Sequence, residues 1–344
     1  MKKDCHKGEK TRKNKIVKKV LIMLLFFLLF NAVTFPIYTF YGPFKKVRNM
    51  LVGLSMATGN HQYIAKFFFS EKEIQEIIKE NNNKLNSESN ADSSESKATE
   101  AQVDIKYTDS NIERIDISNN KFDGIALIVK DPSKLKIGYS DKLGEVGQTV
   151  TQMAKRYNAS AAINGGGYSD VSPTGRTGGV GGVPLGIIIS DGNVIFPTEK
   201  QDYYKSETCV FYIDPNNEAH VGPANVSELI KKNVRQAISF DPSLVVDGKA
   251  YISETSLTGL NPRTAIGQRK DKSIILLAID GRRGIKLGAD LKDVQKVMMD
   301  LGANNAMCLD GGGSTAMYYE GEVINHPSNV TGERFIPDII YVQP

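Results

Sequence analysis

One stretch of the sequence joins an apolar run to a carboxylate, three glycines and two hydroxyls: Asn305-Ala306-Met307-Cys308-Leu309-Asp310-Gly311-Gly312-Gly313-Ser314-Thr315-Ala316-Met317. We interpret the run as a short buried strand that delivers Asp310 to its end. The glycines can adopt positive φ and expose backbone N–H groups, and Ser314 and Thr315 add side-chain donors. This combination suits an anionic or polyhydroxylated ligand held beside a carboxylate. A glycine-rich turn with a surface aspartate is the structural alternative.

The turn does not match a familiar nucleotide-binding loop. The glycines are not followed by Lys-Ser or Lys-Thr, so a Walker A loop is excluded, and their spacing does not fit a dinucleotide fingerprint. The 344-residue chain has a formal net charge of +4, but residues 1–19 alone hold nine Lys/Arg and two acidic side chains. The remainder holds 34 basic and 37 acidic side chains. Because the body is mildly acidic, we expect no nucleic-acid partner.

The basic tail, residues 1–19, precedes an apolar run over residues 20–44. The run is long enough to cross a bilayer, which takes roughly 20 residues. A cleaved signal peptide is the alternative, but its apolar core would be shorter, about 7–15 residues, and no A-x-A-like cleavage site is evident. Lys/Arg on the N-terminal side predicts a cytoplasmic tail, a single-pass signal-anchor in the cell membrane and an extracytoplasmic C-terminal domain.

Composition divides the rest of the chain into three parts. Residues 45–80 are expected to form juxtamembrane helices, with Ser70 and Glu73 as a capping box. Residues 81–103, rich in Asn, Ser, Glu and Lys, cannot bury enough apolar surface to fold, and we predict a flexible linker. Residues 104–344 are long enough for one substantial core.

Cysteine and histidine are scarce, with three and four residues in the whole chain. Cys5 falls in the predicted cytoplasmic tail. The spacing of Cys209 and Cys308 leaves open both a disulfide and a buried free thiol at Cys308. No Cys/His metal constellation is present in the sequence, so no cofactor is expected, although a divalent cation held by carboxylates stays open.

Turn signals and apolar periodicity predict an α+β fold. Strands are predicted at residues 122–130, 160–163, 304–309 and 338–342, with hairpins at 186–196, 244–252 and 263–279 and around 320–321. Helices are predicted at residues 150–157 and 291–301, the second with Asp290 as its N-cap and Gly302 at its end. Because hairpins dominate, we expect a mainly antiparallel or mixed sheet with flanking helices, plus one N-terminal transmembrane helix.

Five polar clusters follow or precede predicted strands, where a sheet can bring them together. They are Asn164-Gly165-Gly166-Gly167-Tyr168, Asn261-Pro262-Arg263-Thr264-Ala265, Asp280-Gly281-Arg282, Asp310 to Thr315, and Glu333-Arg334 before Asp338. Each alone has a structural explanation, since an Asp-Gly pair is usually a turn. We predict that Asp310, Asp280, Arg263 and Asn164 converge on one cleft.

These clusters resemble the phosphodiester glycosidase, or uncovering-enzyme, family. The markers appear in order over roughly residues 120–344: Ile163 to Tyr168, Pro184-Leu185-Gly186, Arg263 to Gly267, Asp280-Gly281-Arg282, Leu301-Gly302-Ala303, Leu309 to Thr315, Glu333-Arg334 and Pro337-Asp338. The animal member of the family removes N-acetylglucosamine from phosphodiester-masked mannose 6-phosphate, and bacterial relatives are connected with exopolysaccharide. The basic tail and single anchor resemble a bacterial envelope protein, so the lysosomal role does not carry over.

The resemblance implies cleavage of a sugar-1-phosphodiester. The phosphodiester leaves as a stable anion, so the usual acid of a glycosidase pair is hardly needed. A carboxylate is needed to stabilise the oxocarbenium-like centre or to activate water, and Asp310 is the first candidate, Asp280 the second and Glu333 the third. The expected ligands of substrate and phosphate are Arg263, Arg282, Arg334, Asn164, Gly165, Gly166, Gly311, Gly312, Gly313, Ser314 and Thr315.

We therefore expect an extracytoplasmic hydrolase that acts on sugar-1-phosphodiester linkages in envelope or extracellular glycans. Two alternatives stay open. One is a catalytically silent module for glycan binding or exopolysaccharide assembly. The other is a metal-dependent phosphodiesterase in which Asp280 and Asp310 hold a divalent cation. The sequence does not identify the sugar, the aglycone or the stereochemical outcome.

Overall fold

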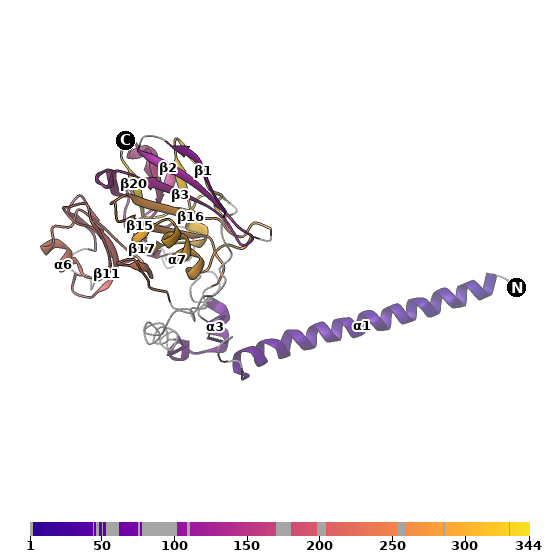
Figure 1. Cartoon of the computed structure of the whole chain (residues 1–344). Coiled ribbons are helices and arrows are strands. Elements are labelled where there is room, and N and C mark those ends of the chain that lie inside the picture. The colour runs from indigo at the N-terminus through magenta and orange to yellow at the C-terminus, as the bar shows by residue number, and fades with distance from the viewer. Residues whose placement is uncertain are drawn as a thin grey trace. The chain divides into compact units, whose positions relative to one another are not determined.

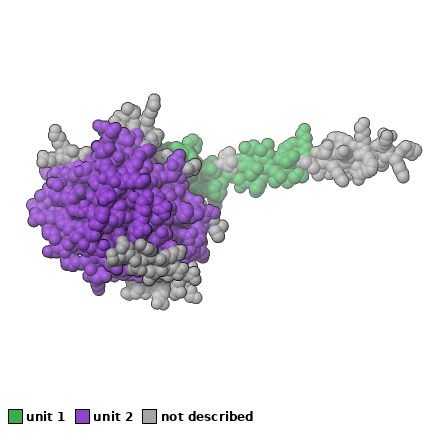
Figure 2. All heavy atoms as spheres, turned by 90° about the horizontal axis from the view of Figure 1, so that it is seen from above, with its two compact units in different colours: residues 1–83 green, residues 84–344 purple. Residues whose placement is uncertain are grey.

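Figure 1 shows the computed structural model of the chain. It describes residues 3–43, 45, 48–49, 51–52, 62–74, 76–77, 102–108, 111–169, 180–197, 204–252, 259–284, 286–329 and 331–344. The chain divides into two compact units, Met1–Asn83 and Lys84–Pro344, coloured separately in Figure 2. Most of the predicted linker at 81–103 lies outside the described residues, but its last two residues already belong to a strand.

The N-terminal unit is helical. Helix α1 (Lys3–Tyr41) contains the stretch Lys18–Tyr41, which is long and apolar enough to cross a membrane, as a signal sequence also would be. Helix α3 (Gln62–Phe68) follows later in the unit, and the Phe68 ring stacks on Phe40 with centroids 4.3 Å apart. The predicted capping box is present, because the backbone N–H of Ser70 donates to Glu73 and the N–H of Glu73 donates to the Ser70 hydroxyl.

The second unit is built mainly from strands. They are β1 (Gln102–Thr108), β2 (Ile112–Ser118), β3 (Asp123–Val129), β4 (Leu135–Tyr139), β5 (Ala161–Asn164), β6 (Tyr168–Ser169), β7 (Val183–Pro184), β8 (Ile188–Ser190), β9 (Asn193–Phe196), β10 (Thr208–Ile213), β11 (Ala219–Ala224), β12 (Gln236–Ser239), β13 (Ser243–Val246), β14 (Lys249–Ala250), β15 (Arg263–Arg269), β16 (Ile274–Ile279), β17 (Ala303–Leu309), β18 (Met317–Tyr319), β19 (Glu322–Val323) and β20 (Asp338–Val342). Among the described residues of this unit, the α-helices are α5 (Val150–Arg156), α6 (Val226–Lys231) and α7 (Leu291–Asp300). Short 3₁₀ turns lie at Pro132–Lys134 and Gly312–Ser314.

The strands form three main sheets in which every described pairing is antiparallel. Their orders are β1-β2-β3-β16-β15-β17-β13-β14, β11-β10-β12-β8-β9 and β19-β18-β5-β20-β4, and β6 pairs with β7 alone. The α+β prediction with a mainly antiparallel sheet is therefore confirmed. All four predicted hairpins are present, as β8–β9, β13–β14, β15–β16 and β18–β19.

Each main sheet turns one face to a shared central core. In β3, Leu127 and Val129 lie in this core while Ala126 and Ile128 face the opposite side, so alternate residues are buried on both faces. The outer faces are covered by helices: α7 on the eight-stranded sheet, α5 on the sheet of β5 and β20, and α6 on the sheet of β10 and β12. Figure 1 shows α7 against β15 and β17.

Helix α7 has the ends that its sequence predicts. The Asp290 side chain accepts from the backbone N–H of Asp293, and the Asp293 side chain accepts in return from Asp290. This reciprocal capping satisfies two N–H groups that the first helical turn leaves without partners. Gly302, with φ +87°, directly follows the C-cap Leu301.

The two cysteines of this unit are free thiols. Cys308 is buried in β17, and the Cys209 sulfur lies 3.1 Å from the Ser243 hydroxyl. Burial raises the pKa of Cys209 to about 11 and that of Cys308 to about 12, so neither thiol is activated as a nucleophile.

Candidate active site

Antiparallel pairing brings three strand ends to one edge of the eight-stranded sheet. Arg263 opens β15 opposite the last residue of β16, and Thr264 lies opposite the last residue of β17. Asp280 and Asp310 directly follow β16 and β17. The edge therefore gathers two carboxylates and a guanidinium from segments far apart in the sequence, as the predicted convergence requires.

The side chain of Asn164, at the end of β5, joins this edge to a second sheet. Its Nδ2 donates to the backbone carbonyl of Asp310 (2.6 Å). Its Oδ1 accepts from the Thr264 hydroxyl (2.8 Å) and from the backbone N–H of Ala316 (3.2 Å). Because Asn164 is 1% exposed, this geometry favours a role in positioning Asp310 over the predicted contact with substrate.

The backbone of Gly165 forms hydrogen bonds with the backbone of two aspartates, Asp338 and Asp310. Its N–H donates to the backbone carbonyl of Asp338 at the start of β20, and its carbonyl accepts from the backbone N–H of Asp310. A Cβ at Gly165 would lie 1.9 Å from Asp338 Oδ1, so no other residue fits without rearrangement. The next backbone N–H, of Gly166, donates to the same Oδ1 (2.7 Å). Both glycines are buried and shape the site from within.

Asp338 is a buried carboxyl that the sequence analysis did not include among the site residues. Its Oδ2 has no hydrogen-bond partner in the part of the chain that the structure describes. Burial raises the pKa of Asp338 to about 7 against the opposing bond from Gly166, and the charge of Asp310 raises it further. In the sequence, Asp338 follows the Glu333-Arg334 cluster and belongs to the marker Pro337-Asp338, but nothing there indicated that the carboxyl is buried at the site.

The glycine turn Gly311–Gly313 is half-buried and lies between two arginines. Gly312, at φ +61°, has a backbone that a side chain would strain, and a Cβ there would lie 3.7 Å from Nη2 of Arg282. A Cβ on Gly313 would lie 3.0 Å from Cδ of Arg334. Arg282 is exposed and Arg334 is half-buried. This surface combines accessible backbone with two planar cations, which suits a phosphate group.

The hydroxyls after the glycines face inward. Ser314 Oγ lies 3.0 Å from the Tyr168 hydroxyl, and the Arg334 guanidinium lies 5.3 Å from the centre of the Tyr168 ring. Thr315 Oγ1 accepts from Thr264 (3.3 Å). Both hydroxyl residues are buried. Tyr168, which closes the first polar cluster of the sequence, is an additional neighbour of the site.

The Arg263 guanidinium donates hydrogen bonds to the surrounding backbone. Its Nε donates to the carbonyl of Ala289 (3.1 Å) and its Nη2 to that of Gly259 (2.9 Å). Burial lowers the pKa of the guanidinium, which nevertheless stays charged. These bonds use donors that the predicted fork would offer to phosphate. Arg282, whose Nη2 donates to Asn261 Oδ1 (3.0 Å), and Arg334 are the arginines that lie beside Gly312 and Gly313.

Asp280 is likewise turned toward the protein. Its carboxylate accepts from Asn325 Nδ2 (3.1 Å) and from the backbone N–H of His326 (3.0 Å), and its Oδ2 lies 2.9 Å from His326 Nδ1. The Arg283 guanidinium is 4.0 Å away. These contacts occupy the carboxylate oxygens that a shared divalent cation would need. His326 carried no motif in the sequence, and only its position beside Asp280 in the fold draws attention to it.

Glu333 belongs to a different interaction. Its carboxylate accepts from the backbone N–H of Thr151 in the first turn of α5 (2.9 Å). An acceptor there stabilises the helix end, so the structure gives this third-ranked catalytic candidate a capping contact.

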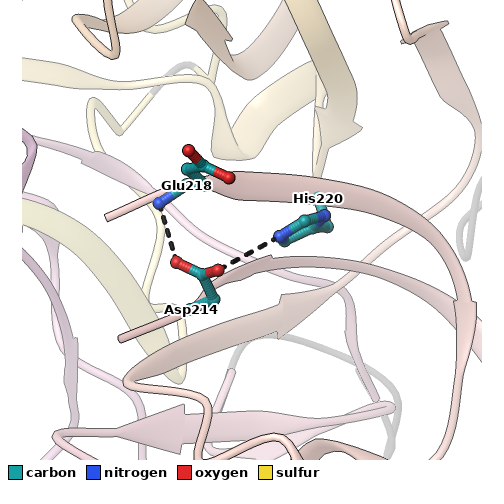
Figure 3. A group of neighbouring side chains, drawn as sticks. All are labelled: Asp214, Glu218 and His220. Carbon is teal, nitrogen blue, oxygen red and sulfur yellow. Dashed lines mark hydrogen bonds and ion pairs between the residues drawn. The ribbon is translucent and has the colours of Figure 1, made fainter. Parts of the chain in front are cut away.

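A second group of titratable side chains lies on the β10–β11 hairpin (Figure 3). Asp214, Glu218 and His220 place their ligand atoms within 4.8 Å of one another. The Asp214 carboxylate accepts from the backbone N–H groups of Asn216 and Glu218, and His220 Nε2 lies 3.6 Å from it. Glu218 pairs with Lys272 (3.0 Å). The turn itself accounts for the grouping, which lies toward the opposite end of β15.

Two surface hollows also lie away from the clustered strand ends. One, of about 470 Å³, is lined by residues that include Gly248, Arg269 and Met299. The other, of about 360 Å³, is lined by residues that include Asn111, Tyr319 and Pro344. Neither contains a residue of the polar clusters, so we assign the site by chemistry and not by the size of a hollow.

Comparison with known proteins shows the family of this chain. Residues 157–343, more than half of the chain, match the phosphodiester glycosidase family model. The uncharacterized SPbeta prophage-derived protein YomE of Bacillus subtilis (strain 168) is 30% identical over 217 residues, 62% of this chain. The chain spans 31% of the length of that relative, so it is similar to only part of it.

One solved structure shares the fold of this chain. The zebrafish N-acetylglucosamine-1-phosphodiester alpha-N-acetylglucosaminidase catalytic domain, auto-inhibited by its pro-peptide, aligns with a TM-score of 0.55 at 22% identity, over 72% of this chain and 83% of that chain. A hypothetical protein from Synechocystis aligns with a TM-score of 0.49 at 17% identity, over 72% and 64% of the two chains. The match to the family model over residues 157–343 places this chain in the phosphodiester glycosidase family.

Proposed function

We propose that this chain is a membrane-anchored, extracytoplasmic hydrolase that cleaves sugar-1-phosphodiester linkages in envelope or extracellular glycans. Family membership supports the reaction class. The observation that carries the proposal is the meeting of Asp310 with a glycine turn that lies beside Arg282 and Arg334. A carboxylate next to two phosphate-binding cations is the arrangement that a glycosyl phosphodiester needs.

The reaction divides the work between these groups. Water adds to the anomeric carbon while the bond from that carbon to the phosphate oxygen breaks, and the electron pair of this bond passes to the phosphate. The products are a free sugar and a phosphate monoester. Asp310 stabilises the positive charge that develops at the anomeric carbon, and Arg282 with Arg334 stabilises the leaving phosphate. A general acid is hardly required because the leaving group is already an anion.

The backbone holds this arrangement in place. The side chain of Asn164 and the carbonyl of Gly165 bind the main chain of Asp310 on both sides of its Cα. The Asp310 side chain accepts from the N–H of Gly311 (3.0 Å). A carboxylate fixed by buried neighbours needs little reorganisation when charge develops beside it.

A silent glycan-binding module is the competing function. Binding alone uses the arginines and the glycine turn, but it gives no reason to place a carboxylate beside an anionic ligand. The repulsion between Asp310 and a bound phosphate would weaken binding, whereas it is useful next to an oxocarbenium-like centre. A metal-dependent phosphodiesterase would need the Asp280 oxygens that Asn325 and His326 occupy.

The membrane location rests on Lys18–Tyr41 and the basic residues before it. Protease added to protoplasts is expected to degrade the C-terminal unit while the first 19 residues stay protected. A C-terminal unit that resists protease in intact protoplasts, or that is released as a soluble form, would contradict the anchored topology.

The reaction is tested with the full chain in detergent micelles on a panel of sugar-1-phosphodiesters. We expect a free sugar and a phosphate monoester in equal amounts, identified by chromatography and mass spectrometry. We expect a chelator to leave the rate unchanged, because Asn325 and His326 occupy the Asp280 oxygens that a divalent cation would need. Binding of panel members without release of either product would support the silent module instead.

A further inference from the structure

The Asp280–His326 pair differs from an ordinary surface ion pair in how its two partners are buried. The Asp280 side chain is 8% exposed, whereas the His326 side chain is 61% exposed, and their Oδ2 and Nδ1 atoms are 2.9 Å apart. One ring nitrogen therefore faces a buried acceptor, and most of the ring faces solvent. This is the geometry of an imidazole that the protein orients for use at its outer nitrogen.

The surroundings of Asp280 determine which nitrogen carries the proton. The carboxylate already accepts from Asn325 Nδ2 and from the backbone N–H of His326, so it acts as an acceptor. An acceptor at 2.9 Å requires a hydrogen on His326 Nδ1. In the neutral ring, Nε2 then has a free lone pair and can take a proton.

His326 also lies in the segment that borders the glycine turn. The preceding residue, Asn325, donates to the backbone carbonyl of Thr315 (3.3 Å). Two residues after the histidine, the Ser328 hydroxyl donates to the carbonyl of Gly312 (3.3 Å). The segment is thus tied to Gly312 within the glycine turn and to Thr315, which follows the turn, so His326 belongs to a segment that lies beside the proposed phosphate site.

We propose that His326 is the general base of the hydrolysis and that Asp280 is its positioning residue. Nε2 takes the proton of the attacking water as the water oxygen bonds to the anomeric carbon and the electron pair of the broken bond leaves with the phosphate. The imidazolium then returns its proton to solvent. This inference rests on the proposed function and gives Asp280 a place in it, acting through His326 in place of a direct contact with substrate.

Anchoring of the loop is the competing explanation. Asp280 binds the backbone N–H of His326 and the side chain of Asn325, so it holds residues 325–326 whether or not the ring takes part in catalysis. A test has to separate loss of this anchor from loss of the base. The exposed ring allows that separation, because removing it leaves the Asp280 bonds to the backbone and to Asn325 in place.

The test uses His326→Ala in the full chain, assayed in detergent on the best sugar-1-phosphodiester. We expect kcat to fall about 100-fold or more, the usual contribution of a general base. Added imidazole should restore part of the rate in proportion to its concentration. The matched control is His220→Ala, which removes the half-exposed histidine beside Asp214 and should leave kcat unchanged without any response to imidazole.

A double-mutant cycle tests the positioning role. Asp280→Asn can present an amide donor to Nδ1, which favours the wrong tautomer, so kcat should fall while KM changes little. Adding His326→Ala to Asp280→Asn should cost little more, because both changes disable one unit. Thermal unfolding of each variant shows whether it remains folded. If His326→Ala does not fold, His326→Gln takes its place in the cycle.

The outcomes distinguish this inference from the function on which it rests. Full turnover by a folded His326 variant, or a large loss that imidazole does not restore at all, would overturn the general base while leaving the glycosidase intact. Additive losses in the cycle would overturn the positioning role of Asp280. If the unmodified chain hydrolyses no member of the panel, the proposed function fails and the general base fails with it.

Discussion

Polar residues gather at both ends of the β15–β17 pair, but the two ends use them differently. At the end near residue 268, the buried Gln268 side chain accepts from Ala219 N and donates to the carbonyls of Asn217 and Lys272. Asn305 donates beside it to the Ala219 carbonyl. These bonds close on the backbone of neighbouring turns. At the other end, polar groups of the same kinds surround a half-buried carboxylate and a glycine turn.

The difference lies in what the buried groups hold. At the Gln268 end, the network fixes hairpins, and the side chains that reach solvent, such as Lys272 and Glu218, pair with each other. At the Asp310 end, buried Asn164 and Asp280 hold Asp310 and His326, whose side chains reach the surface. A polar cluster at a strand end is thus a candidate site when its buried members orient exposed ones.

The largest effect is expected from Asp338, a buried carboxyl at the Asp310 end whose Oδ2 has no hydrogen-bond partner among the described residues. Its pKa rises from an ordinary 3.8 to about 7, so between these pH values the folded chain keeps a proton that the unfolded chain loses. Stability should therefore fall as pH rises through this window, by at most about 4 kcal/mol. Asp338→Asn cannot titrate and should show a flatter dependence in denaturant unfolding at pH 4, 5.5 and 8.

The Asp338 experiment also has a clear contrary result. The unfolding free energy of Asp338→Asn should fall less steeply with pH than that of the unmodified chain. Equal slopes would mean that the Asp338 carboxyl of the unmodified folded chain is already ionised at pH 5. The matched comparison is Asp214→Asn at the other end, which should not reduce the fall in stability between pH 5 and 8, because the pKa of Asp214 is lowered and not raised.

Asp310→Asn should lower turnover by about 100-fold or more, close to 3 kcal/mol of transition-state stabilisation. The amide keeps the shape and the bond from Gly311, so the variant should unfold at nearly the same temperature. Asp214→Asn removes a carboxylate from the Gln268 end and should turn over at the rate of the unmodified chain. Full hydrolysis by Asp310→Asn would return the glycine turn to its structural explanation.

Arg282→Lys should raise KM about tenfold, which corresponds to about 1.4 kcal/mol. A lysine keeps the charge but loses the planar fork that contacts two phosphate oxygens at once. Lys272→Ala removes an exposed cation from the opposite end and should leave KM unchanged. Equal KM values for Arg282→Lys and the unmodified chain would move phosphate binding to Arg334 alone.

Local chemistry made much of this fold predictable. Asp191-Gly192 and Asp247-Gly248 have positive φ at both positions, as a two-residue hairpin turn requires, and both hairpins form. The last strand, Asp338–Val342, has the predicted bounds. Strand ends placed Asp310, Asp280 and Arg263 on one edge because antiparallel neighbours alternate direction.

Contacts between distant segments were not predictable in the same way. Strand β1 begins at Gln102, inside the predicted linker, because its pairing with β2 outweighs a polar composition. His326 follows Asn325 and precedes a proline with no recognisable motif, and it meets Asp280 across 46 positions. The partners of Arg263 were also not predictable, because they are backbone carbonyls outside its own strand, those of Gly259 and Ala289.

The smallest effect is expected at the β10–β11 hairpin. Partial burial raises the pKa of Asp214, but the backbone N–H groups of Glu218 and Asn216 outweigh this effect and lower it. The contribution of Asp214 to stability is therefore present above about pH 4 and is lost on acidification. Asp214→Asn keeps an oxygen for these donors and should cost under about 1 kcal/mol at pH 7, with no difference at pH 2. Denaturant unfolding at both pH values measures this cost. A rise in the melting temperature with added zinc that Asp214→Asn abolishes would show instead that Asp214, Glu218 and His220 form a metal site.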